Sequence, residues 1–110
     1  MVDYYTIQNK SRLIDSKEAL SDFVKNLLLR NYKIYDIFQT NGELIPYHSH
    51  SYKEQIIILK GQIRMIVEEN IIDLHAGDII TIEPWAIHLA SFPSKEGARY
   101  YLCYPQKSKK

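Results

Sequence analysis

From residue 33 to residue 104, the sequence is a succession of short apolar segments separated by turn residues, and this limits the folds open to the chain. Sixteen of the 110 residues are isoleucine and nine are tyrosine, and β-branched and aromatic side chains favour strands. The strand candidates lie at 33–38, 55–59, 62–68, 71–74, 79–82, 87–92 and 99–104. Many short strands at such spacing predict an antiparallel sandwich or barrel.

A helical pattern precedes these strands. Asp15 and Glu18 have the spacing of a capping box, and the apolar residues after them recur at the interval of one helical face. Those apolar residues are Leu20, Phe23, Val24, Leu27 and Leu28. The pattern predicts one α-helix over about 16–30.

Length and charge exclude several classes of protein. A chain of 110 residues fits one domain with one core. With 14 basic and 13 acidic residues, its net charge of +1 offers no electrostatic case for binding nucleic acid or an anionic membrane. No apolar stretch approaches the ~20 residues that span a bilayer, and no apolar signal-peptide core follows Met1, so we expect a cytoplasmic protein. The single cysteine, Cys103, excludes an internal disulfide.

We divide the chain into three segments. Residues 1–32 form an N-terminal segment whose helix packs on the barrel, residues 33–104 form the barrel, and residues 105–110 form a basic tail expected to be disordered. Small barrels have exposed edge strands, which are commonly covered by another subunit. Together with the aromatic pair Tyr4 and Tyr5, this favours a homodimer.

Three of the four histidines are spaced so that strands can gather them. His48 and His50 are two residues apart, and such residues of a strand share a face. Glu54 follows four residues later, and His88 lies on a strand candidate that could pair alongside. Three imidazoles and a carboxylate suit a first-row divalent metal. A single histidine on a strand is more often structural, so this spacing alone leaves both interpretations open.

The residues around these histidines resemble two sequence motifs of one family. The first motif of the cupin superfamily is matched without a gap by Gly42-x5-His48-x-His50-x3-Glu54-x6-Gly61. The stretch from Gly77 to His88 resembles the second motif. It departs at Glu83 and Trp85, where the family usually has a proline and a glycine, and Phe92 stands in place of a closing asparagine.

The resemblance implies a small single-domain cupin of the conserved-barrel, RmlC-like type. Its fold would be all-β, a double-stranded β-helix or jelly-roll barrel, with one N-terminal α-helix added. One divalent transition metal would lie near a mouth of the barrel, held by His48, His50, Glu54 and His88. Iron, manganese, nickel, cobalt and zinc all accept such a ligand set.

Two functions from different classes follow. We favour a metal-dependent enzyme acting on a small oxygen-rich metabolite, a hydroxy or keto acid or a sugar-like molecule, by isomerase, lyase or dioxygenase chemistry. Tyr47, Tyr52, Ile56 and Trp85 are the candidate substrate-binding residues, and no catalytic acid or base stands out. The alternative is a non-catalytic module that binds or senses a small molecule. A barrel whose histidines no longer bind metal is a third interpretation.

Overall fold

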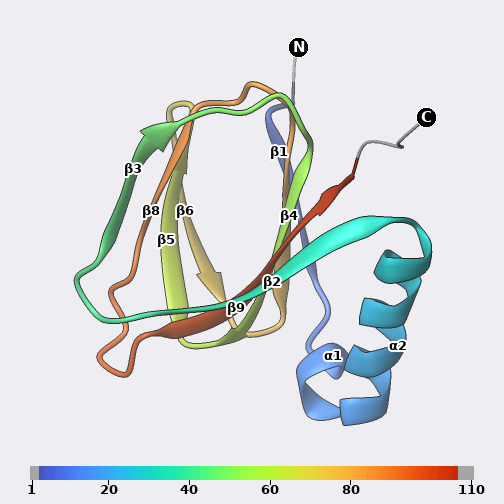
Figure 1. Cartoon of the computed structure of the whole chain (residues 1–110). Helices are drawn as coiled ribbons and strands as arrows, with labels where there is room; N and C mark the ends of the chain where they lie inside the picture. The colour runs from blue at the N-terminus through green and yellow to red at the C-terminus, as the bar shows by residue number, and fades with distance from the viewer. Residues whose placement is uncertain (1–2, 107–110) are drawn as a thin grey trace.

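Two antiparallel sheets face each other and form a barrel (Figure 1). The structure, a computed structural model, describes residues 3–106. Its elements are β1 (Tyr5–Asn9), α1 (Arg12–Asp15), α2 (Lys17–Leu29), β2 (Tyr32–Gln39), β3 (Leu44–His48), β4 (Glu54–Lys60), β5 (Gln62–Val67), β6 (Asn70–His75), β7 (Asp78–Ile82), β8 (His88–Ser91) and β9 (Ala98–Pro105). One sheet has the order β1-β7-β4-β9-β2 and the other β3-β8-β5-β6. The predicted jelly-roll barrel is confirmed.

The helix predicted over 16–30 is α2, but its first turn differs from the expectation. The hydroxyl of Ser16 accepts a hydrogen bond from the backbone N–H of Ala19 at 3.2 Å, so Ser16 is the N-cap. Asp15 instead ends the short helix α1, which the sequence pattern did not predict. The capping box predicted on Asp15 and Glu18 is therefore wrong by one residue.

Two strands also escaped prediction. β1 extends the five-stranded sheet by pairing with β7, with Tyr5 opposite Ile82. β3 pairs with β8, and its register shifts between Ile45 and His48. Pro46 lies within that shift and obscures the strand pattern, because proline cannot donate to a ladder and is tolerated only at edges and bulges.

The barrel has two apolar layers, and β4 contributes to both. Inside the barrel, Ile56 and Ile58 pack with residues of the facing sheet. On the outer face, Ile57 and Cys103 pack beneath Leu27 of α2, and Figure 1 shows the helices beside this sheet. Burial of both faces explains why residues 55–59 are almost continuously apolar.

Gly61 lies between β4 and β5 at a φ of +82°. A Cβ at this position would clash with the carbonyl oxygen of Gly97 and approach the Cα of Ala98 to 3.0 Å. We expect Gly61→Ala to lower the free energy of unfolding by about 3 kcal/mol, since it adds overpacking to left-handed strain. Urea denaturation followed by circular dichroism measures this loss.

Gly42 provides the control for Gly61, because it has a φ of +87° but no neighbouring atom within 4 Å of the point that a Cβ would occupy. Gly42→Ala carries only the backbone strain, about 1 kcal/mol. Equal losses in the two variants would show that the contact with Gly97 contributes nothing.

The C-terminal end of the barrel extends one residue beyond the expected boundary. Pro105 is the last residue of β9, and the N–H of Gln106 donates to the carbonyl of Asn31 at 3.0 Å. The predicted basic tail falls largely on residues 107–110, which lie outside the described residues. No helix within residues 3–106 has the length and apolar character needed to cross a bilayer.

Candidate metal centre

Three histidines from separate parts of the chain converge at the end of β3. His48 ends β3 and His88 begins β8, and the two residues are partners in the antiparallel pairing. This confirms that the strand carrying His88 pairs alongside. One ring nitrogen from each of His48, His50 and His88 lies within 4.8 Å of the other two.

The expectation that His48 and His50 share the face of one strand is wrong. β3 ends at His48, and His50 lies in the connection to β4. The carbonyl of His50 accepts a hydrogen bond from the N–H of Trp85 at 2.8 Å, which ties this connection to the one between β7 and β8. The convergence of the three rings therefore depends on a tertiary contact as well as on strand alternation.

Each imidazole is oriented by a backbone carbonyl. The Nδ1 atoms of His48, His50 and His88 lie 2.9, 3.2 and 2.8 Å from the carbonyl oxygens two residues away. Because a carbonyl oxygen only accepts, Nδ1 carries the proton and Nε2 keeps its lone pair. The buried Nε2 atoms of His50 and His88 have no hydrogen-bond partner among the described residues. Orphaned imidazole lone pairs fit a metal ion.

Glu54 lies beside the three histidines, although it is not part of the group whose ligand atoms all lie within 4.8 Å of one another. Its side chain is buried on β4, with Oε2 3.0 Å from Nε2 of His50 and Oε1 3.7 Å from Nε2 of His88. Burial raises the pKa of Glu54 to about 7, and burial lowers the pKa of His50 and His88. Burial thus disfavours the charged forms of both Glu54 and these two histidines. A cation bound beside Glu54 would favour the ionised carboxylate again.

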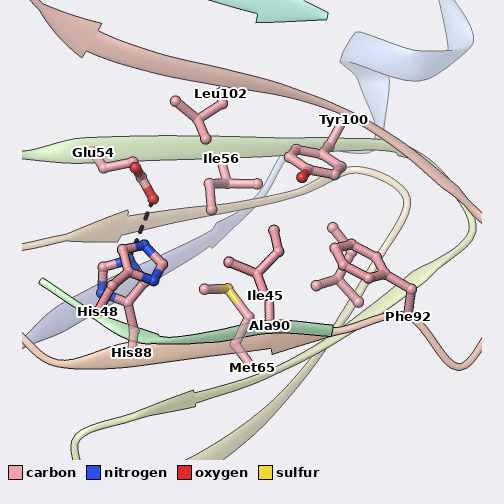
Figure 2. A pocket seen from close by; sticks show the side chains of 11 residues that line it. Ile45, His48, Glu54, Ile56, Met65, His88, Ala90, Phe92, Tyr100 and Leu102 are labelled. Atoms are coloured by element: carbon pink, nitrogen blue, oxygen red, sulfur yellow. Dashed lines mark ion pairs between the residues drawn. The ribbon is translucent and has the colours of Figure 1, made fainter. Parts of the chain in front are cut away.

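A cavity of about 110 Å³ extends from this cluster into the barrel. It is lined by Ile45, His48, Glu54, Ile56, Ile63, Met65, His88, Ala90, Phe92, Tyr100 and Leu102. Figure 2 shows the histidines and Glu54 on one side and the apolar residues filling the rest. Ile56, Ala90 and Phe92 therefore point into the barrel, on the same side as Glu54 and His88.

The four candidate substrate-binding residues lie in different places. Ile56 lines the cavity, whereas Tyr47 and Trp85 do not and are exposed by 55% and 66%. Tyr52 stacks on the ring of His50. Trp85 has a φ of +68°, which explains why glycine is common at this motif position.

Sequence reasoning missed Tyr100, which is the cavity residue with a hydroxyl group. Ala98, Tyr100 and Leu102 point inward from β9, while Tyr101 and Cys103 pack in the outer layer. Alternation along this strand indicates that Ala98, Tyr100 and Leu102 share one face. It does not indicate which face is the interior of the barrel, because both faces of β9 are apolar.

The stacked pair formed by His50 and Tyr52 makes a testable prediction. Their rings are parallel, 4.1 Å apart between centroids, and Tyr104 packs against Tyr52 at 4.4 Å. We expect Tyr52→Ala to weaken Zn²⁺ binding about tenfold, because groups that orient a ligand tune metal affinity. Tyr52→Phe keeps the stack and should keep the affinity. Calorimetric titration measures both, and equal affinities in the two variants would contradict a positioning role.

A two-sheet barrel with clustered histidines beside an internal cavity is the architecture of a cupin. The sequence profile of the family described as "Cupin domain" matches residues 36–104. The chain therefore belongs to the cupin family. No curated protein matches the sequence.

Solved structures similar to this chain include several cupins. An RmlC-like cupin from Shewanella frigidimarina is 21% identical with a TM-score of 0.63, over 72% of this chain and 70% of that chain. The DMSP lyase DddQ from Ruegeria pomeroyi is 17% identical, with a TM-score of 0.64 over 74% and 41%. A variant of salicylate 1,2-dioxygenase from Pseudoaminobacter salicylatoxidans is 8% identical, with a TM-score of 0.61 over 68% and 21%. Such low identities show the shared fold alone.

Proposed function

We propose that this protein is a metal-dependent enzyme that acts on a small molecule bound in the barrel. The observation that carries the proposal is the arrangement of three carbonyl-oriented imidazoles, each with one ring nitrogen within 4.8 Å of the other two, beside Glu54. His48, His50, Glu54 and His88 are the proposed ligands of one divalent transition metal. When bound, such an ion supplies a Lewis acid for an oxygen atom of the substrate.

The residues around the site orient the proposed ligands and exclude water. The backbone carbonyls of Pro46, Tyr52 and Ala86 hold the imidazole tautomers. The apolar lining excludes water from the cavity and lowers its dielectric. The Glu54 carboxyl has a pKa of about 7 in the metal-free site, and a bound cation would displace its proton and hold it as the carboxylate.

The similar structures support an enzyme in general terms. They include a lyase and a dioxygenase, and one fold can host many unrelated reactions. The proposal therefore does not choose between lyase, isomerase and dioxygenase reactions.

A binding or sensing module is the second candidate, and one observation favours it. The polar side chains that line the cavity are His48, Glu54, His88 and Tyr100. Apart from the proposed metal ligands, Tyr100 alone could act as an acid or base there. A module that only holds a ligand needs no such group.

Metal analysis of protein purified without a polyhistidine tag tests the proposal. We expect about one divalent ion per chain after reconstitution, and conversion of at least one compound from a small-molecule panel followed by mass spectrometry. Compounds that raise the melting temperature of the metal-loaded protein without being converted would favour the sensing module. Failure to bind any divalent ion would overturn the metal-dependent enzyme.

We also propose a homodimer. Leu28 and Leu29 at the end of α2, which contacts the edge strand β2, are exposed by 57% and 75%, and Ile7 on β1, the opposite edge strand of the same sheet, is exposed by 44%. Exposed apolar groups near an unpaired edge are suited to a second subunit. Sedimentation velocity at micromolar concentration should give the mass of a dimer, and a monomer would contradict the proposal.

A further inference from the structure

The cavity behind the candidate metal centre is almost entirely apolar away from its mouth. Of the eleven residues that line it, seven are aliphatic, phenylalanine or methionine, and none is lysine, arginine, asparagine or glutamine. Its polar side chains occur in two places. His48, Glu54 and His88 lie together at one end, and the hydroxyl of Tyr100 lies near the other (Figure 2).

Between those two ends, a ligand would contact only the carbon and sulfur atoms of apolar side chains. Ile45, Ile56 and Met65 occupy this middle part of the cavity in Figure 2. A ligand hydroxyl placed there would give up its hydrogen bonds to water without replacement. An unsatisfied buried polar group costs about 1–3 kcal/mol, so a molecule with several hydroxyls would be rejected strongly.

The volume sets an upper limit on the ligand. A dry cavity of about 150 Å³ lined by apolar side chains accepts benzene. The 110 Å³ of this cavity are a smaller volume, so the enclosed hydrocarbon body is at most about the size of one small ring or a short branched chain. A polar head of such a ligand would remain at the end where the histidines and Glu54 lie.

We infer that the ligand of this site is a small, predominantly apolar molecule with a single oxygen-donor head, such as a carboxylate, directed at the candidate metal centre. This inference rests on the proposed function for the role of the head. It narrows the expectation of an oxygen-rich metabolite and disfavours sugar-like and polyhydroxy compounds.

Three probes separate the parts of this inference. Benzene tests the apolar body alone, benzoate tests the body with its head, and gluconate tests a polyhydroxy carboxylate. Binding to the metal-free and the Zn²⁺-loaded protein is measured by calorimetry and by thermal shift. We expect benzene to bind both forms, and benzoate to bind the Zn²⁺-loaded form at least tenfold more tightly than gluconate and more tightly than the metal-free form.

Ala90 allows the cavity to be filled from one position. Ala90 lines the cavity and is 7% exposed, and the three added carbon atoms of Ala90→Leu would occupy the space of a ligand. We expect this variant to lose benzene and benzoate binding more than tenfold while still taking up Zn²⁺, which also shows that it folds. Ala90→Ser adds little volume and should keep benzoate affinity within about threefold.

The outcomes distinguish this inference from the proposed function. The chain could take up no Zn²⁺ and still bind benzene in a manner sensitive to Ala90→Leu. This result would refute the proposed function and the placement of the oxygen-donor head at a metal, but it would support an apolar ligand body in the cavity. If Zn²⁺ binds and gluconate matches benzoate, the inference is overturned while the metal site remains. Benzoate binding unchanged by Ala90→Leu would also overturn it.

Discussion

Replacing His50 with alanine is expected to lower the affinity for Zn²⁺ by at least a hundredfold and to leave the barrel folded. His50 offers a buried Nε2 atom that lies 3.0 Å from the Glu54 carboxyl. Its side chain lies in a connection rather than in either apolar layer. Loss of a ligand exceeds the tenfold to hundredfold effect of losing a group that only orients one. Calorimetric titration and metal analysis measure the loss.

His75 provides the matched control for this variant. It is an exposed histidine at the end of β6, and it is not one of the three clustered histidines. His75→Ala should retain full metal content, and the circular dichroism spectra of both variants should match that of the natural chain. Unchanged metal content in His50→Ala would remove His50 from the proposed ligand set. Equal losses in the two variants would point to adventitious binding at surface histidines.

Glu54→Gln is expected to stabilise the metal-free protein at pH 8 and to weaken metal binding. Burial raises the pKa of Glu54 from 4.5 to about 7 in the folded chain. The folded state thus holds this proton more tightly than the unfolded chain does. The contribution of Glu54 to the free energy of unfolding is fully present below pH 4.5 and is lost as the pH rises through 7. At pH 8 the loss corresponds to roughly 3 kcal/mol.

A glutamine has the shape of the glutamate without its charge, so it avoids this loss, and its amide can donate to an imidazole Nε2. The gain in the free energy of unfolding should be about 3 kcal/mol at pH 8 and about 1 kcal/mol at pH 5. Urea denaturation in the presence of a chelator measures it. Zn²⁺ affinity should fall tenfold or more, because an amide replaces a carboxylate as the proposed ligand.

Glu69→Gln is the control, because Glu69 is exposed in the turn between β5 and β6. We expect its stability to follow that of the natural chain at both pH values. A Glu54→Gln variant that is less stable than the natural chain at pH 8 would show that neighbouring groups already stabilise the Glu54 carboxylate without a metal. A variant that keeps full Zn²⁺ affinity would exclude Glu54 as a ligand.

The strands after residue 50 were predictable because their side chains alternate or remain apolar over short runs. β5 pairs with β6 through a turn at Glu68 and Glu69, and Val67 lies opposite Asn70. β1 and β3 were not predictable in the same way. β1 is mostly exposed, and β3 contains Pro46 and a shift of register, so neither carries the periodic signal of a half-buried strand.

Which residues are candidate metal ligands could be predicted from the sequence, because residue type and spacing are local properties. His48, His50 and Glu54 lie within seven positions, and strand alternation determines which neighbours of Glu54 and His88 share their face. Where those residues meet was decided by the tertiary structure. The pairing of His48 with His88 and the bond from Trp85 to His50 join segments about 35 to 40 residues apart. The apolar cavity exists only because both sheets contribute to its walls, and packing between distant strands is not encoded in any single segment.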